Sequence, residues 1–392
     1  MRGKAELAGR TPYAVGESAA GRTPYSVGEP AAGRKDTVCG KQMICLILSA
    51  LILWLLTGCM VDQHPEDVRT TAVETVETML TITDPVEKAA VEKAKSEVRA
   101  MDAEPRIVAT SPSVAEICDR LELPLVGVCA STISELPKRY ADVTTVGTAM
   151  SPDMEIVSSL NPDWILSPSS LQTDLEPKYE SLDTEWAFLN LRSVQGMYRS
   201  IRELGEIFDR EEQAQTMVEE FQDFYEEYKS QNEGKAHPKV MILMGLPGSY
   251  IIATENSYVG SLVELAGGEN VYAGTDQEFL TVNTEDMEKK NPDVILRAAH
   301  ALPDQVVEMF KEDFETNDIW KHFSAVQNGR VYDLTYEYFG MSANFYYPEA
   351  LKELQPMLYP DSDAGAGTAG NSASGDNASG AASDDKKEGA TS

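Results

Sequence analysis

The chain of 392 residues carries a formal net charge of −31, of which residues 105–360 alone account for −24. Such a negative field disfavours nucleic acid and anionic membrane surfaces as partners and favours docking onto a basic protein. The length and a hydrophobic content of 42% allow two globular units, and we find no Walker A loop, nucleophile elbow or metalloprotease helix that would support an enzyme.

Residues 1–58 contain a twelve-residue repeat, AGRTPYAVGESA then AGRTPYSVGEPA, followed by the apolar run MICLILSALILWLLTGCM. The run holds about 14 apolar residues, too few to span a bilayer comfortably, and it is typical of a signal peptide. Its end, Leu56-Thr57-Gly58-Cys59, resembles the lipobox of bacterial lipoproteins. We therefore expect residues 1–58 to be removed and Cys59 to carry a lipid anchor; the alternative is a short membrane helix with an incidental cysteine.

The segments on either side of the globular part are polar. Residues 59–104 include helix-forming stretches such as PVEKAAVEKAKSEVRAM but no broad apolar face, so we expect a partly helical tether behind the anchor. Residues 361–392 are mostly Gly, Ala, Ser and Asp, a composition that predicts disorder. Cys118 and Cys129 lack Cys-x-x-Cys spacing and are expected to be buried thiols.

Two segments show the same alternation of strand and helix patterns. In residues 105–192, the strand RIVAT leads into the helix pattern SPSVAEICDRL, and the strands LVGVC and EWAFLNL follow. Residues 236–360 repeat the order with the strand KVMILMG and a last strand RVYDL. Each segment also has a helix bearing a glutamate, Glu155 or Glu285, before Asn-Pro-Asp and a strand. The pattern predicts two α/β lobes with parallel sheets.

Residues 193–235 lie between the two lobes. Apolar side chains recur there at helical spacing from Val194 to Tyr228. We therefore expect one long backbone helix, followed by a turn, that joins the lobes and permits only small hinge motions between them.

The stretch NPDVILRAAHALPDQV, residues 291–306, places His300 among alanines just after a strand and before a helix that starts at Pro303. Ala298, Ala299 and Ala301 would let a flat ligand approach the backbone closely. By spacing alone, however, His300 is more typical of a surface or capping histidine.

The layout of residues 105–358 resembles the helical-backbone class of bacterial substrate-binding proteins, which serve importers of iron chelates, cobalamin and haem. Within that class, the sequence is similar to the haem-receptor lipoproteins of the iron-regulated surface determinant system of Gram-positive bacteria. The stretches that carry the similarity are VGTAMSPDMEIV, HPKVMILMGLPGSYIIATENSYVGSLVELAGGENV, NTEDMEKKNPDVILRAAHALP and NDIWKHFSAVQNGRVYDL.

This resemblance implies a ligand cleft between the lobes and haem, iron protoporphyrin IX, as the transported ligand. It also implies that Met150 and His300 are the axial ligands of the haem iron, one from each lobe, which agrees with the need for a donor on each face of the ring. In the family, the pair that falls here on Glu155 and Glu285 meets arginines of an ABC permease. On residue type alone a methionine is more often a core residue, but Met150 lies outside the apolar periodicity.

Anionic propionates are expected to meet hydroxyls and helix N-termini. The candidates are placed by position only, and capping of their own helix is an adequate alternative for each serine. They are Thr110, Ser111, Ser113, Ser131, Thr132 and Arg297. Near the C-terminal end of the second lobe, an aromatic-rich loop should contribute partly to a ligand wall and partly to the core, through Tyr336, Tyr338, Phe339, Met341, Phe345, Tyr346 and Tyr347.

We therefore expect a haem receptor, lipid-anchored outside the cytoplasmic membrane, that takes haem from surface or secreted carrier proteins and delivers it to an ABC permease for iron acquisition. An alternative in the same fold is a receptor for a ferric siderophore, which Arg297 could suit, or for cobalamin. A rival of another class is a haem-degrading enzyme, which would consume haem where a receptor returns it intact.

Overall fold

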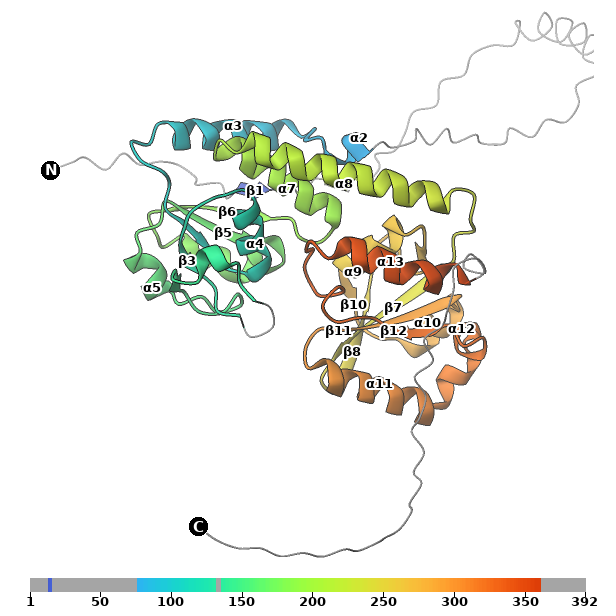
Figure 1. The fold of residues 1–392 in the computed structure, drawn as a ribbon. Helices are drawn as coiled ribbons and strands as arrows, with labels where there is room; N and C mark the ends of the chain where they lie inside the picture. The colour runs from blue at the N-terminus through green and yellow to red at the C-terminus, as the bar shows by residue number, and fades with distance from the viewer. Residues whose placement is uncertain (1–12, 16–75, 132–134, 361–392) are drawn as a thin grey trace, which may run out of the picture.

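The computed structural model describes residues 13–15, 76–131 and 135–360 (Figure 1). Two α/β lobes lie side by side beneath a long helix that extends from one to the other (Figure 1). Cys59, Thr132 and residues 361–392 lie outside the described residues. Within the part described, no helix is both long and apolar enough to cross a membrane.

The first lobe contains a sheet in the order β1-β6-β5-β2-β3-β4, and every neighbouring pair is parallel, as the alternating pattern predicts. Its strands are β1 (Tyr13–Val15), β2 (Ile107–Ala109), β3 (Leu125–Val128), β4 (Thr144–Thr145), β5 (Trp164–Pro168) and β6 (Glu185–Leu189). Its helices are α4 (Pro112–Arg120), η1 (Lys138–Tyr140), α5 (Met154–Ser159), η2 (Ser169–Leu171) and α6 (Gln172–Tyr179). The edge strand β1 belongs to the segment that we expect to be removed with the signal peptide.

The second lobe has a sheet in the order β10-β8-β7-β11-β12, with β9 beside β7. Its strands are β7 (Lys239–Leu246), β8 (Ser249–Ala253), β9 (Glu269–Asn270), β10 (Phe279–Leu280), β11 (Val294–Ala299) and β12 (Val331–Asp333). Its helices are α9 (Tyr258–Leu265), α10 (Thr284–Lys290), α11 (Pro303–Thr316), η3 (Asp318–His322), α12 (Ser324–Gln327) and α13 (Tyr347–Leu358). The expectation of a parallel sheet is wrong for part of this lobe: the sheet is mixed, because β8 runs antiparallel to β7 and β10. The two residues between β7 and β8, Pro247 and Gly248, can join only antiparallel strands.

The repeated Asn-Pro-Asp has the same structural role in both lobes. Asn161 and Asn291 adopt the left-handed conformation just after α5 and α10, with φ of 44° and 37°. Asp163 then accepts a hydrogen bond of 2.8 Å from the backbone N–H of Arg106, and Asp293 accepts one of 2.8 Å from Lys239. The motif thus ends a helix and fixes the start of the next parallel strand, which explains why it appears twice.

The expectation of one continuous helix between the lobes is wrong. Two helices, α7 (Val194–Ile207) and α8 (Glu211–Asn232), are separated by a turn in which Asp209 has φ of 60°. The helices fold against each other at Gly205, where an added Cβ would lie 2.6 Å from the Cβ of Ala214. Both helices keep the apolar spacing because each packs on the other and on the lobes, so α8 alone is the long connector.

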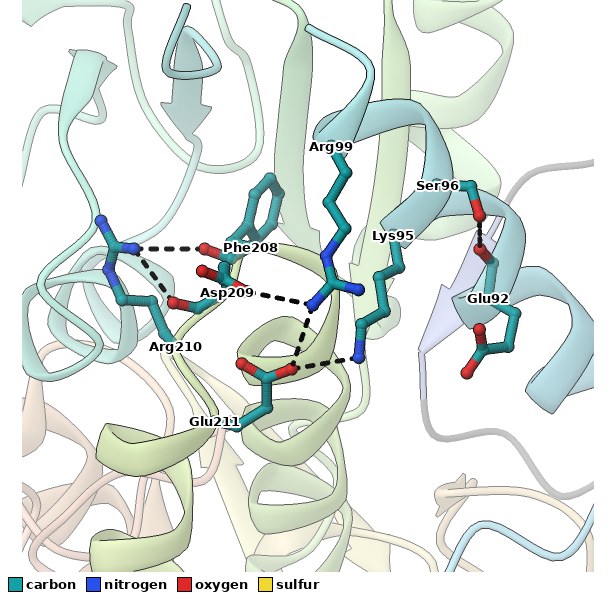
Figure 2. A network of polar contacts seen from close by, with 8 residues as sticks. All are labelled: Glu92, Lys95, Ser96, Arg99, Phe208, Asp209, Arg210 and Glu211. Atoms are coloured by element: carbon teal, nitrogen blue, oxygen red, sulfur yellow. Dashed lines mark hydrogen bonds and ion pairs between the residues drawn. The ribbon is translucent and has the colours of Figure 1, made fainter.

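Part of the expected tether is folded. Residues 76–99 form α2 (Val76–Leu80) and α3 (Pro85–Arg99), which pack on α7 and bury Val91 and Ala94. Ion pairs hold the end of α3 to the turn between α7 and α8 (Figure 2): Arg99 lies 3.1 Å from Asp209, and Lys95 lies 3.0 Å from Glu211. The residues that pair with Lys95 and Arg99 of α3 lie more than 100 positions further along the chain.

One cluster of buried side chains runs from α4 and β2 through α7 and α8 to α9 and α13, so the lobes share a core on the side of the connecting helices. Separate clusters cover the other face of each sheet. Cys118 and Cys129 are buried free thiols, which confirms the expectation, and burial raises the pKa of Cys129 to about 11.

Candidate functional site

The loops that follow parallel strands carry the residues of interest. In parallel α/β sheets, ligands bind outside the carboxyl ends of the strands. Met150 lies in the loop between β4 and α5 of the first lobe, and His300 directly follows β11 of the second. Segments at such strand ends also join the lobes, since the backbone N–H of Ala343, after β12, donates to the carbonyl of Leu191, after β6, at 2.7 Å.

Met150 projects from a compact loop. The loop closes on itself through a bridge between Gly147 and Pro152 and through a hydrogen bond of 2.7 Å from the N–H of Asp153 to the carbonyl of Val146. The side chain of Met150 is left 70% exposed. That exposure excludes the core alternative, because a core methionine is enclosed by its neighbours.

His300 is half-buried and held by its backbone. Its N–H donates to the carbonyl of Gly245 at 2.9 Å, which extends the pairing of β11 with β7, and its carbonyl accepts a hydrogen bond of 3.4 Å from the Tyr336 hydroxyl. Within the described residues, neither ring nitrogen has a hydrogen-bond partner. Burial lowers the pKa of the imidazole, which therefore stays neutral near pH 7 and keeps a lone pair available for a metal. It does not cap α11, whose N-cap residue is Leu302.

Two of the side chains proposed as propionate contacts already have partners for their polar groups. Thr110 is fully buried, and its hydroxyl lies 2.8 Å from the Ser167 hydroxyl. Arg297 forms a bidentate pair with Asp333 at 2.7 and 2.5 Å. The sequence does not show that Asp333 of β12 lies directly opposite Arg297 of β11 in the sheet.

The remaining hydroxyls differ in accessibility. Ser111 is buried and caps α4 by accepting a hydrogen bond of 3.2 Å from the N–H of Val114, as the alternative reading expected. Ser113, on the first turn of α4, and Ser131, after β3, are partly exposed and remain candidates. Thr132 lies outside the described residues.

The aromatic loop after β12 divides between core and surface. Phe339 and Tyr347 are buried in the shared core, whereas Tyr346 is 53% exposed. Phe345 lies under the guanidinium of Arg120 from the first lobe, 3.8 Å from its ring centre. Near His300, the structure adds a residue that the sequence analysis did not single out, Leu302, which is 54% exposed. Its position beside a proline gave no signal, because an apolar residue there is normally read as core.

Glu155 and Glu285 occupy equivalent places. Each is the second residue of its helix, α5 or α10, and each is exposed. Asp153 and Asn283 cap these helices, so neither glutamate is needed as a cap. The two carboxylates are therefore available on the surface, one on each lobe.

The Met150 thioether and the His300 imidazole limit the kind of metal that the strand-end loops could bind. Among the described residues, no group of three or more His, Cys, Asp or Glu side chains could hold a bare metal ion. One thioether and one imidazole, from opposite lobes, suit an iron whose other positions are filled by a macrocycle. A cavity of about 560 Å³ also opens at the strand ends of the first lobe, between α6 and Arg192, but Met150 does not line it.

Comparison with known proteins places these features in context. A family model described as periplasmic binding protein matches residues 107–338. The high-affinity heme uptake system protein IsdE of Staphylococcus aureus strain Newman is 42% identical over 261 residues, which cover 65% of this chain and 88% of that protein. The crystal structure of S. aureus IsdE complexed with heme is matched with 41% identity and a TM-score of 0.61, over 66% of this chain and 100% of the other. An ABC transporter substrate-binding protein from Listeria monocytogenes EGD-e is matched with 50% identity and a TM-score of 0.63, with the same coverage.

Proposed function

The chain belongs to the periplasmic binding protein family, and from that premise we propose that it binds haem outside the cytoplasm and delivers it to an ABC importer. Its relatives at 41–50% identity are by name a haem-uptake protein and a transporter substrate-binding protein, so the chain is a binding protein for transport and not an enzyme. Haem is accordingly its cargo and not a resident cofactor.

One observation carries the proposal for the site. A methionine 70% exposed at a strand end of one lobe and a neutral, unpaired imidazole at a strand end of the other can occupy the two axial positions of haem iron. Because the Arg297 guanidinium is paired with Asp333, the feature that would suit an anionic siderophore is absent at that residue.

Haemin titration of the purified protein tests this assignment. We expect a one-to-one, six-coordinate complex, and we expect Met150→Ala and His300→Ala each to change the visible spectrum. Met101→Ala and His322→Ala are matched controls, because both lie away from the strand-end loops. The ligand assignment is wrong if Met150→Ala and His300→Ala both bind haemin with the wild-type spectrum. Binding of a siderophore or cobalamin in place of haemin would overturn the function itself.

We also propose that Cys59 carries a lipid that holds the protein at the outer face of the cytoplasmic membrane. Two features of the sequence support this proposal. Leu56-Thr57-Gly58-Cys59 resembles a lipobox, and the apolar run before it is too short to serve as a membrane-spanning anchor, so a lipid would be needed to hold the protein at the membrane. Cys59→Ala should impair processing and release protein from the membrane fraction. Normal processing and retention of this variant would refute the lipid anchor.

We propose that a surface or secreted carrier protein donates haem to this protein. We also propose that Glu155 and Glu285 dock the protein onto its permease. Two exposed carboxylates at equivalent places can meet two basic sites of a dimeric permease. Glu155→Ala combined with Glu285→Ala should leave haemin binding unchanged and sharply reduce haem uptake. The control is Glu180→Ala with Glu288→Ala, two other exposed glutamates, one on each lobe. Normal uptake by the first double variant, at normal surface abundance, would contradict the proposal.

A further inference from the structure

Leu302 has an unusual backbone conformation. Five non-glycine residues of the described chain have positive φ. Four of them follow the C-terminal end of a helix, where the left-handed conformation is a common cap, and they are Glu122, Asn161, Asp209 and Asn291. Leu302, with φ of 49° and ψ of 61°, is instead the residue before a helix, α11. The conformation is unfavourable for a residue with a Cβ, and the residue before a proline is normally extended.

Local structure does not require a leucine at this position. The carbonyl of Leu302 accepts hydrogen bonds from the N–H groups of Gln305 at 3.0 Å and Val306 at 3.1 Å. These are backbone interactions that any residue provides. Glycine or asparagine would adopt the same backbone more readily, and the side chain makes no capping hydrogen bond to α11. The reason for a leucine must therefore lie in what its side chain contacts.

The side chain of Leu302 does not pack in the core, since it is 54% exposed. Of the five large hydrophobic side chains exposed in the described part of the chain, Met150 and Leu302 lie in loops that follow strands, after β4 and β11. Leu302 is two residues from His300, so its Cα lies within about 7.6 Å of that residue's Cα. This distance is short compared with the width of a porphyrin. Local strain held at an exposed apolar residue beside a metal donor is typical of a ligand-binding position.

We propose that Leu302 is a haem-retaining residue, whose side chain covers apolar surface of the macrocycle bound through His300. The proposal rests on the proposed function and adds a residue to that site. Leu302 does not ligate iron, so it acts on how long haem stays and not on the coordination. The chain thus accepts a strained backbone in the unliganded protein and recovers apolar burial when the ligand is bound.

The test measures haem release and stability in the same variants. The full chain, purified in a mild detergent, is loaded with haemin, and transfer to excess apomyoglobin is followed spectroscopically. Leu302→Asn and Leu302→Gly should release haemin roughly tenfold faster. In the wild type, haem would bury the exposed half of the leucine side chain, and that burial slows release by about this factor. Both variants should keep the wild-type haem spectrum, and the unliganded proteins should unfold at the same or a higher temperature, since the strain is relieved.

Two further variants are controls. Leu302→Met keeps an apolar side chain and should release haemin at close to the wild-type rate. Asp209→Gly changes another left-handed residue, in the turn between α7 and α8, and should not change release. Wild-type release rates for Leu302→Asn and Leu302→Gly would overturn the proposal, and so would a clear loss of thermal stability, which would mean that the leucine supports the fold. If the wild-type protein itself fails to bind haemin, the proposed function fails as well.

Discussion

The buried carboxyl group of Glu203 predicts that the protein becomes less stable as the pH rises. Glu203 lies on α7 with no exposed surface, next to the carboxyl group of Glu87. Arg199, one turn earlier on α7, pairs instead with Glu87 of α3 at 2.7 Å. Burial is the main cause that raises the pKa of Glu203 well above its ordinary value, and the hydrogen bond and the negative charge of Glu87 add to it. Arg199 lowers this pKa and Glu206 raises it, but both have smaller effects.

The sign of the effect follows from proton binding. Between the ordinary pKa of 4.5 and the raised pKa, the folded protein binds a proton at Glu203 that the unfolded chain has lost. The loss of folding stability caused by ionising Glu203 is absent below pH 4.5, grows as the pH rises through this window, and is constant above it. This loss amounts to about 1.4 kcal/mol for each unit by which the pKa in the folded protein exceeds the pKa in the unfolded chain. Glu203→Gln, which keeps the shape without the charge, should therefore make the protein more stable than the wild type at pH 7.5.

Urea unfolding at several pH values between 4.5 and 8 measures this difference. The free energy of unfolding of Glu203→Gln minus that of the wild type should be near zero at the acidic end and rise with pH. Glu212→Gln, an exposed residue on α8, is the control and should show no such trend. A difference that is flat with pH, or that favours the wild type at pH 7.5, would refute the reasoning.

Three further predictions concern stability. Arg99→Ala should lower the free energy of unfolding by less than about 1 kcal/mol, and less at high salt, because its ion pairs are exposed; a larger loss in urea unfolding would contradict this. Gly260→Ala should greatly reduce the yield of folded protein, since the new Cβ would lie 1.8 Å from the carbonyl oxygen of Thr254; a normal melting temperature would be the opposing result. Tyr198→Phe should cost about 1 kcal/mol, because it removes the buried 3.1 Å hydrogen bond to the hydroxyl of Tyr347, and calorimetry that shows no change would argue against that bond.

The sequence predicts best what depends on local patterns. The strand and helix order of both lobes, the exposed glutamates and the Asn-Pro-Asp turns are all encoded in short stretches. The break at Asp209 was missed because apolar periodicity continues across it and does not report a change of direction. The docking of α3 was missed for another reason: it depends on Glu87 meeting Arg199 on a helix 112 residues away.

Candidate site residues follow the same division. Their position at strand ends could be read from the sequence, and it holds for Met150 and His300. The partners of a side chain across a sheet could not be read, because they depend on strand order and register. The sequence therefore does not show that the Thr110 hydroxyl donates to the carbonyl of Leu166, or that Arg297 pairs with Asp333.

The shared core limits how ligand exchange can occur. Phe221 of α8 stacks on Tyr198 of α7, with ring centres 4.5 Å apart, and meets Tyr347 of α13 edge-on at 5.5 Å. These three side chains are buried, so a wide opening of the lobes would expose them to water at a cost of several kcal/mol. Haem entry and release should therefore rely on the strand-end loops, where Met150 and Leu302 are exposed, and not on separation of the lobes. A residue such as Leu302 can then set the residence time of haem without any change in the connecting helices.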